Sequence, residues 1–287
     1  MPLGKTIQIY LPGGNPRGLK IADVTSRTVQ AILIPRSTLN MALKRAELEN
    51  VGLYFLIGNP DDETKPLVYI GEAEDCRARL QQQNKAKDFW NVAIVIISKT
   101  KLFTKAHVKY LEWYCYTQAK KAGRYRIENA NEPTRPHISE PTRDDLLDNF
   151  ETIRLLVSTL GYPIFDPIVK PKDKEMLICK FGDKVYAEGE LTEEGFVVFK
   201  GSTARIEETK TIGKWATDLR AKLLREGVLV EDKEKGVYRF TQDHVFSSPS
   251  SAAVTVLGRN ANGWTVWKYK NGKTLDEVKR SGNAGYS

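Results

Sequence analysis

The chain has 287 residues, a length that suits two domains better than one, and 41% of them are hydrophobic, as is ordinary for a globular protein. No apolar run reaches the roughly 18 residues of a membrane span, and residues 1–10 lack the apolar core of a secretory signal, so we expect a cytoplasmic protein with no membrane partner. The 44 Lys and Arg residues outnumber the 36 Asp and Glu residues, and this formal charge of +8 favours a polyanionic partner such as nucleic acid, although a mildly basic protein needs none.

The first half of the chain alternates between short strand patterns and helical patterns. In chain order we expect strands at residues 7–10, 29–34, 52–57, 67–71 and 92–97, and helices at residues 37–48, 73–83, 104–121 and 144–160. The strand at 92–97 is a continuous apolar run, which indicates a central strand covered on both faces. Together these elements predict an α/β (α+β) fold, with a small, mostly antiparallel sheet flanked by helices.

A segment rich in proline and lysine, from Pro163 to Lys174, separates this half from a second α+β domain. In the second domain we expect a helix around Leu219, a hairpin from Val228–Val230 to Val237–Phe240, and a strand at Trp264–Tyr269 between two Asn-Gly turns. The predicted parts are an extension packed on the core domain, the core domain itself and a C-terminal domain, at residues 1–50, 51–165 and 166–287.

Two triplets on adjacent predicted strands contain the residues best suited to chemistry. Gly52-Leu53-Tyr54 and Tyr69-Ile70-Gly71 place two phenols on neighbouring strands. Three further polar residues follow on the next elements in chain order: Arg79, Glu112 and Asn129. In this order and spacing, the residues from about Val51 to Asn131 resemble the GIY-YIG nuclease superfamily.

The resemblance implies a metal-dependent endonuclease, a hydrolase that cuts phosphodiester bonds in DNA, with a prokaryotic role in defence, repair or a mobile element. Residues 51–165 would then form the nuclease domain. The sequence departs from the family in two places: Gln83 stands where many members carry a histidine, and the loop from Gly58 to Pro66 is long.

Phosphodiester cleavage needs an activated water molecule and stabilisation of the negative charge at phosphorus. Tyr54 or Tyr69 would take the proton from water, and Tyr54 is the first candidate because it lies deeper in its strand. A phenol is a poor base near its usual pKa of about 10, so a cation must help it. Arg79 offers a fork of donors to a phosphate oxygen. Both tyrosines are also common in sheets, so a purely structural role is the alternative.

Glu112 borders the apolar face of its predicted helix, about 20° outside the arc that Val108, Leu111, Cys115 and Ala119 share. A carboxylate in that position is costly unless it is paired or binds a cation. We therefore expect Glu112 to bind Mg²⁺ or Mn²⁺, with a salt bridge as the alternative. The three cysteines have no metal-ligand spacing, which argues against zinc.

Other polar residues near these motifs are candidates with weaker individual support. His107 is expected to assist proton transfer, although a partly exposed helical histidine is common. The candidates for substrate binding are Arg77, Asn129, Asn131, Lys105 and Lys109.

The stretch from Trp215 to Lys279 resembles an accessory domain of uncharacterised function that is often fused behind GIY-YIG nucleases. Arg259, Lys268 and Lys270 are candidates for DNA contacts there, together with Trp264. Alternatively, Trp264 and Trp267 simply fill a small core. For the whole chain, two other functions stay open: a non-catalytic DNA-binding protein on the same scaffold, and an RNA endonuclease.

Overall fold

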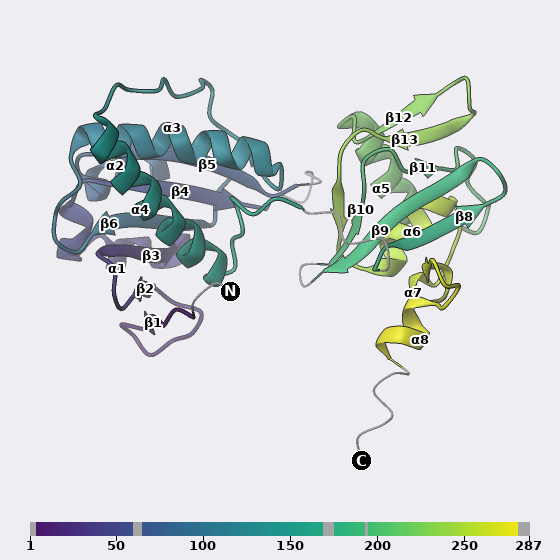
Figure 1. The fold of residues 1–287 in the computed structure, drawn as a ribbon, viewed down its shortest axis with the longest axis horizontal. Helices are drawn as coiled ribbons and strands as arrows, with labels where there is room; N and C mark the ends of the chain where they lie inside the picture. The colour runs from purple at the N-terminus through teal and green to yellow at the C-terminus, as the bar shows by residue number, and fades with distance from the viewer. Residues whose placement is uncertain (1–3, 60–64, 169–174, 193–194, 281–287) are drawn as a thin grey trace, which may run out of the picture. The chain divides into compact units, whose positions relative to one another are not determined.

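The structure is a computed structural model that describes residues 4–59, 65–168, 175–192 and 195–280. The chain divides into two compact units, Met1–Ile168 and Val169–Ser287 (Figure 1). Parts of the predicted loop 58–66 and of the proline- and lysine-rich segment lie outside the described residues. Both units combine helices with mostly antiparallel sheets, so the predicted α/β (α+β) fold class is confirmed.

A seven-stranded sheet forms the centre of the first unit, in the order β1-β2-β3-β6-β4-β5-β7. Its strands are β1 (Ile7–Tyr10), β2 (Lys20–Val24), β3 (Val29–Pro35), β4 (Gly52–Gly58), β5 (Leu67–Ala73), β6 (Val92–Ser98) and β7 (Arg126–Ile127). Every neighbouring pair is antiparallel except β5 and β7. The predicted central strand is β6, and because β3 pairs with it along seven residues, the strands β1, β2 and β3 belong to the same sheet as β4, β5 and β6.

Alternation of side chains divides the residues of this sheet between two apolar cores. One face packs against α3 (Lys105–Ala122) and α4 (Glu140–Thr159), and the other face packs against α1 (Leu39–Ala42) and α2 (Cys76–Ala86). On β4, Leu53 and Phe55 belong to the first core and Tyr54 to the second. The register therefore decides which side chains meet α2 and which meet α3.

The prediction of one continuous helix at residues 37–48 is wrong. The structure has three short pieces instead, η1 (Arg36–Thr38), α1 and η2 (Ala46–Glu49), with an extended backbone at Arg45. The break lets the carbonyl of Arg45 accept a hydrogen bond from Arg77 of α2 at 2.9 Å. A tertiary contact therefore overrides the local helical pattern.

Helix α4 begins earlier than predicted, at Glu140 rather than at Asp144. The side chain of Ser139 caps it by accepting from the backbone N–H of Thr142 at 3.4 Å. Pro141 falls in the first turn, where the missing N–H of proline costs nothing, so this proline does not delay the helix.

The second unit contains a five-stranded sheet, β14-β10-β9-β8-β15, and a three-stranded sheet, β11-β13-β12. The strands are β8 (Leu177–Phe181), β9 (Val185–Thr192), β10 (Gly195–Val198), β11 (Thr203–Ala204), β12 (Leu229–Asp232), β13 (Val237–Phe240), β14 (His244–Phe246) and β15 (Lys268–Tyr269). The helices are α5 (Lys214–Arg225), α6 (Pro249–Leu257), α7 (Gly263–Val266) and α8 (Leu275–Lys279). The hairpin predicted around Lys235-Gly236 is present as β12 and β13.

The predicted strand Trp264–Tyr269 is wrong in its first half, which forms α7. The side chain of Asn262 accepts from the backbone N–H of Trp264 at 3.0 Å, so this Asn-Gly pair caps a helix instead of turning a hairpin. Trp267 is fully buried and donates its Nε1–H to the carbonyl of Pro249 at 3.0 Å, so this tryptophan fills the core of the second unit, as the structural alternative predicted. Trp264 is half-buried, with the Arg280 guanidinium 3.6 Å from its ring centroid.

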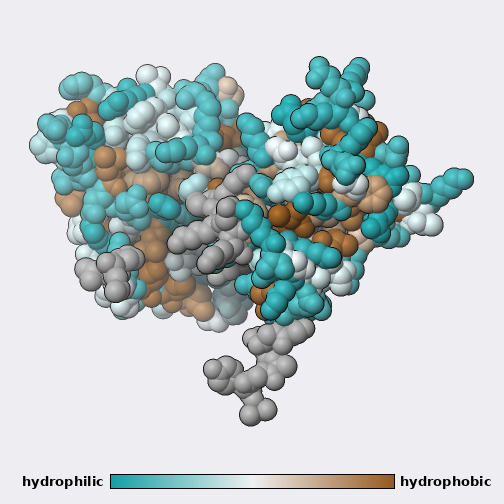
Figure 2. Space-filling model, turned by 45° about the vertical axis from the view of Figure 1, so that its right-hand side comes forward, coloured by the Kyte–Doolittle hydropathy of each residue, from teal (hydrophilic) through white to brown (hydrophobic). Residues whose placement is uncertain are grey.

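The surface in view is mostly hydrophilic, with smaller hydrophobic areas between the hydrophilic residues (Figure 2). Within the described ranges, no helix combines the length and apolarity that crossing a membrane requires.

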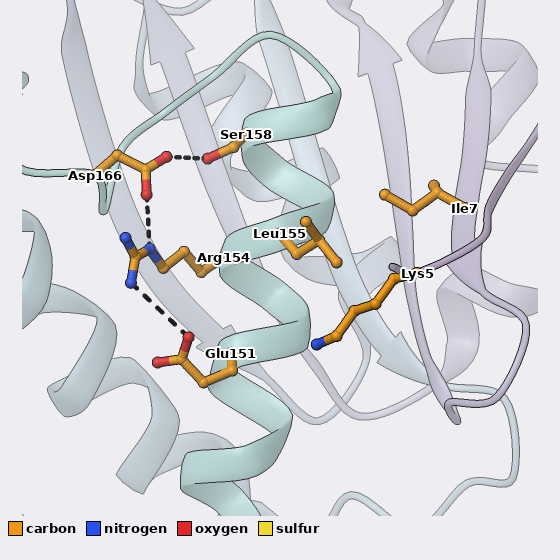
Figure 3. Close-up of a pocket in the computed structure, with 7 residues that line it drawn as sticks. All are labelled: Lys5, Ile7, Glu151, Arg154, Leu155, Ser158 and Asp166. Carbon is orange, nitrogen blue, oxygen red and sulfur yellow. Dashed lines mark hydrogen bonds and ion pairs between the residues drawn. The ribbon is translucent and has the colours of Figure 1, made fainter. Parts of the chain in front are cut away.

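The last residues of the first unit are tied to α4 (Figure 3). Asp166 accepts hydrogen bonds from Nε of Arg154 at 2.6 Å and from the hydroxyl of Ser158. Phe165 is buried, and its ring packs edge-on against Phe55 with the centroids 5.6 Å apart. A cavity of about 490 Å³ lies beside this ion pair. The segment that leaves α4 is therefore part of the core of the first unit.

We expect residues 1–168 to fold when expressed alone, whereas residues 1–162 should be much less stable. The shorter fragment loses Ile164 and Phe165, which are both buried. Loss of one buried aromatic side chain typically costs about 3–5 kcal/mol. Urea unfolding followed by circular dichroism measures the difference, and equal stability of the two fragments would show that these residues contribute nothing to the core.

Candidate active site

Tyr54 and Tyr69 lie on the same face of the sheet, on adjacent strands. The register pairs Tyr54 with Gly71 and Tyr69 with Leu56, so the two rings are diagonal neighbours. Their centroids are 5.9 Å apart and the ring planes differ by 27°. Gly71 makes this packing possible, because a Cβ at that position would lie 2.4 Å from the Tyr54 hydroxyl.

Helix α2 places Arg79 and Gln83, one turn apart, against the Tyr54 hydroxyl. Gln83 donates from Nε2 to that oxygen at 3.1 Å, and the hydroxyl also interacts with the Tyr69 hydroxyl and the Arg79 guanidinium. Tyr54 is fully buried, and this burial, reinforced by Tyr69, raises its pKa well above the ordinary value for a phenol. The Tyr54 phenol therefore stays protonated at neutral pH.

Helix α3 places Glu112 against the outer edge of β5. Strand β7 pairs with only the first two residues of β5, and side chains continue the ladder beyond it. Asn129 accepts from the backbone N–H of Ile70 at 3.0 Å and donates to the Ile70 carbonyl at 2.7 Å. The carboxylate of Glu112 accepts from the backbone N–H of Glu72. Two predicted site residues therefore also complete the sheet.

Burial first, and then the neighbouring carboxylate of Glu72, raise the pKa of Glu112 to about 7. The charges of Arg79 and Lys109 act in the opposite direction. Glu72 was not singled out from the sequence. Its signal was available, since it directly follows the Tyr69-Ile70-Gly71 triplet and alternation puts it on the α3 side of the sheet.

Glu112 and Glu72 form a pair of half-buried carboxylates, and carboxylate oxygens are the ligands that a hard divalent cation takes in proteins. Among the residues that the structure describes, no group of three or more His, Cys, Asp and Glu side chains could hold a metal ion. Mg²⁺ keeps several water ligands and commonly takes only one or two protein carboxylates. Glu112 and Glu72 fit that requirement, because each would be more stable with a cation nearby.

Two predicted substrate-binding lysines share a face of α3 with Glu112. Lys105, Lys109 and Glu112 follow at intervals of four and three residues, which places them along one stripe of the helix. Both lysines are exposed, and Lys105 forms an ion pair with Glu74 at 3.1 Å. This stripe adds positive charge beside the carboxylate.

Arg77 has a structural partner instead of a place at the site. Its guanidinium forms an ion pair with Glu49 at 2.7 Å and donates to the carbonyl of Arg45, so it holds η2 against α2. Asn131, by contrast, is exposed two residues after Asn129. Of the predicted asparagines, Asn129 is the one that contacts the Tyr69-Ile70-Gly71 strand.

His107 caps the start of α3. It is the third residue of the helix in a capping box, in which the Thr104 hydroxyl accepts from the His107 N–H at 3.4 Å, and its Nδ1 lies 3.4 Å from the backbone N of Thr104 and 3.2 Å from the carbonyl oxygen of Leu102. This role accounts for a histidine at this position, and the geometry gives no support to the proton transfer expected of it.

Replacing Glu112 with Gln should stabilise the protein at high pH in the absence of divalent ions. The folded pKa of about 7 lies above the ordinary 4.5, so Glu112 imposes no penalty on folding below about pH 4.5. As the pH rises from there through 7, the unfolded chain releases the proton more readily than the folded protein does. The free energy of unfolding therefore falls, because the buried carboxyl must finally ionise. Glu112→Gln keeps an acceptor for the Glu72 N–H but cannot ionise. Thermal unfolding in EDTA should give the variant a higher melting temperature above about pH 8 and an equal one near pH 4. Equal melting temperatures at both values would contradict the raised pKa.

Comparison with known proteins gives a family match for the second unit. Residues 177–279 match the family model of a domain of unknown function, DUF4357. No GIY-YIG family model matches the first unit. No curated protein and no solved structure matches the chain. The C-terminal domain is therefore similar to a family without an assigned activity, and the first unit must be interpreted from its own residues.

Proposed function

We propose that the first unit is a metal-dependent endonuclease that hydrolyses phosphodiester bonds in DNA. The observation that carries the proposal is the position of Arg79, whose charge acts both on the Tyr54 hydroxyl and on the Glu112 carboxylate. Arg79 thus lies near two groups that belong to the combination that the GIY-YIG resemblance assigns to catalysis.

Glu112, with Glu72 beside it, would hold Mg²⁺ or Mn²⁺. Such an ion, when bound, stabilises negative charge on the phosphate and activates a water molecule. The two carboxylates supply the hard oxygen donors that these ions prefer. Asn129 and the Glu72 N–H fix the strand edge against which Glu112 is held.

Tyr69 is better placed than Tyr54 to accept a proton, which reverses the order preferred from the sequence. Tyr54 is fully buried and stays protonated, so we assign it a positioning role: its hydroxyl orients the side chains of Tyr69 and Arg79. Tyr69 is half-buried, and the ammonium of Lys87 lies 4.4 Å from its ring centroid. The partial exposure of Tyr69 makes it the better placed of the two tyrosines to meet a water molecule.

Arg79 would donate to a non-bridging phosphate oxygen, and Lys105 and Lys109 would contact the flanking backbone. The basic stripe beside Glu112 supports a polyanionic substrate. Two other functions are separated from this one by experiment: DNA binding without catalysis, and cleavage of RNA.

The direct test is incubation of the protein with plasmid DNA, DNA oligonucleotides and RNA in Mg²⁺, Mn²⁺ or EDTA. We expect DNA cleavage with either ion and none in EDTA, because Glu112 and Glu72 need a cation to act. Glu112→Ala should abolish turnover and leave DNA binding largely intact, whereas Glu151→Ala, which removes an exposed carboxylate of α4, should behave as wild type. Undiminished cleavage in excess EDTA would refute the metal requirement. Binding without cleavage by the wild-type protein would favour the non-catalytic alternative.

Tyrosine-to-phenylalanine variants test the assignment of the two phenols. Each variant keeps the ring and loses one hydroxyl, so stability should fall by only about 0.5–1.5 kcal/mol. Under single-turnover conditions, Tyr69→Phe should lower the cleavage rate by at least about a hundredfold, the usual scale for loss of general acid–base help. Tyr54→Phe should cost less, and Tyr114→Phe, which alters a tyrosine packed against Phe150, should cost nothing. A larger loss at Tyr54 than at Tyr69 would restore the order preferred from the sequence, and near-normal rates for both would remove the tyrosines from the mechanism.

A further inference from the structure

A cavity of about 630 Å³ lies in the second unit, between three segments that come from different parts of the chain. These segments are the tip of the β8–β9 hairpin, residues 205–207 and the start of β13. The volume falls in the range of small-molecule sites. Its lining combines an aromatic ring, charged side chains and two glycines that carry no side chain.

The ring of Phe181 lines the cavity and is not part of the hydrophobic core of the second unit. It ends β8 on the same side as the buried Cys179, yet it is 40% exposed. The guanidinium of Arg205 lies 4.9 Å from the ring centroid, and Glu207 orients that guanidinium through two hydrogen bonds, at 2.7 and 3.0 Å. An exposed ring flanked by an arginine is a stacking surface for a base, and it is tolerant of sequence because every base has a π face.

The buried side chain of Arg220 anchors the segment that carries Arg205. Arg220 of α5 is 1% exposed and donates to the Glu208 carboxylate at 2.8 Å. It also donates to the carbonyls of Arg205 and Ile206, at 2.5 and 3.2 Å. The backbone N–H of Arg205 donates to the carbonyl of Val256 at 2.8 Å. The segment that places Arg205 beside Phe181 is therefore pre-organised, which reduces the entropic cost of binding.

The rim of the cavity offers complementary polar groups. Gly182 and Gly236 have positive φ values of +57° and +64° and carry no side chain, so the backbone stays open at both hairpin tips. The ammonium of Lys184 lies 3.8 Å from the position that a Cβ on Gly236 would occupy. Lys184 supplies a positive charge for a phosphate, and the carboxylate of Asp183 suits the amino group of a base.

We propose that this cavity binds an unpaired nucleotide of single-stranded nucleic acid, with the base on Phe181 and the adjacent phosphate on Lys184. The site lies wholly within the domain of unknown function and does not depend on the proposed nuclease chemistry of the first unit.

Fluorescence anisotropy of the full-length protein with a labelled single-stranded DNA of about 12 nucleotides tests the proposal, in EDTA so that no strand is cut. Phe181→Ala should weaken binding at least about fivefold, and Phe181→Leu should weaken it equally, because stacking needs the ring and not only apolar bulk. Lys184→Gln should reduce the slope of log K against log salt by about 0.7, the value for one phosphate contact on a single strand. Unlabelled mononucleotides and a duplex of the same length serve as competitors: competition by the single strand is expected to be strongest, and stronger competition by the mononucleotide or the duplex would overturn the choice of ligand.

Tyr186→Ala provides a matched control on the same hairpin. Tyr186 is also 40% exposed, and Lys180 lies 5.2 Å from its ring centroid. The register pairs Phe181 with Val185 and Lys180 with Tyr186, so Tyr186 faces the opposite side of the hairpin. Its replacement should leave affinity unchanged, and a loss as large as that of Phe181→Ala would overturn the proposal, as would wild-type affinity of Phe181→Leu.

Photo-crosslinking keeps the test informative even if the first unit also binds the strand. A single strand carrying 5-bromodeoxyuridine should crosslink to the peptide that contains Phe181, and mass spectrometry locates the product. Crosslinks confined to the first unit would contradict the site. Thermal unfolding of each variant confirms that a loss of binding does not come from a loss of fold.

Discussion

The unpaired outer edge of β5 is the constraint on which the candidate active site depends. Strand β7 covers only its first two residues, and buried backbone groups beyond that point need other partners. Asn129 bonds both backbone groups of Ile70, and Glu112 accepts from Glu72. The same side chains thereby complete the sheet and fix the position of α3. A carboxylate used in this way is held half-buried beside a second carboxylate, which is the property that suits it to a cation.

The two proposed sites are built in different ways. In the first unit, the candidate residues lie on and around strand β5 of one sheet. Gly71 leaves space for the Tyr54 hydroxyl, and the charge of Arg79 acts on both Tyr54 and Glu112. In the second unit, a cavity forms between two hairpin tips and a segment anchored by the buried Arg220. Under the two proposals, the first unit cuts a strand and the second recognises an unpaired part of the same nucleic acid.

Local patterns in the sequence determined most of the secondary structure and the composition of the candidate site. Strand β6 follows from an unbroken apolar run, and α3 from an apolar stripe with Thr104 before it and Gly123 after it. The paired triplets predicted two tyrosines on adjacent strands, and they lie there. These features were readable because each depends on residues that are close together in the chain.

Only the tertiary structure decided the protonation and the partners of those residues. Burial by distant segments keeps Tyr54 protonated, and the contact of α3 with β5 brings Glu112 beside Glu72. Arg77 and Arg79 are two residues apart on one helix, yet Arg77 pairs with Glu49 and Arg79 interacts with the Tyr54 hydroxyl, since residues at that spacing do not share a helix face. Burial and long-range pairing depend on how remote segments pack, so the sequence indicated several residues of the candidate site but not their partners or the charge that each of them carries.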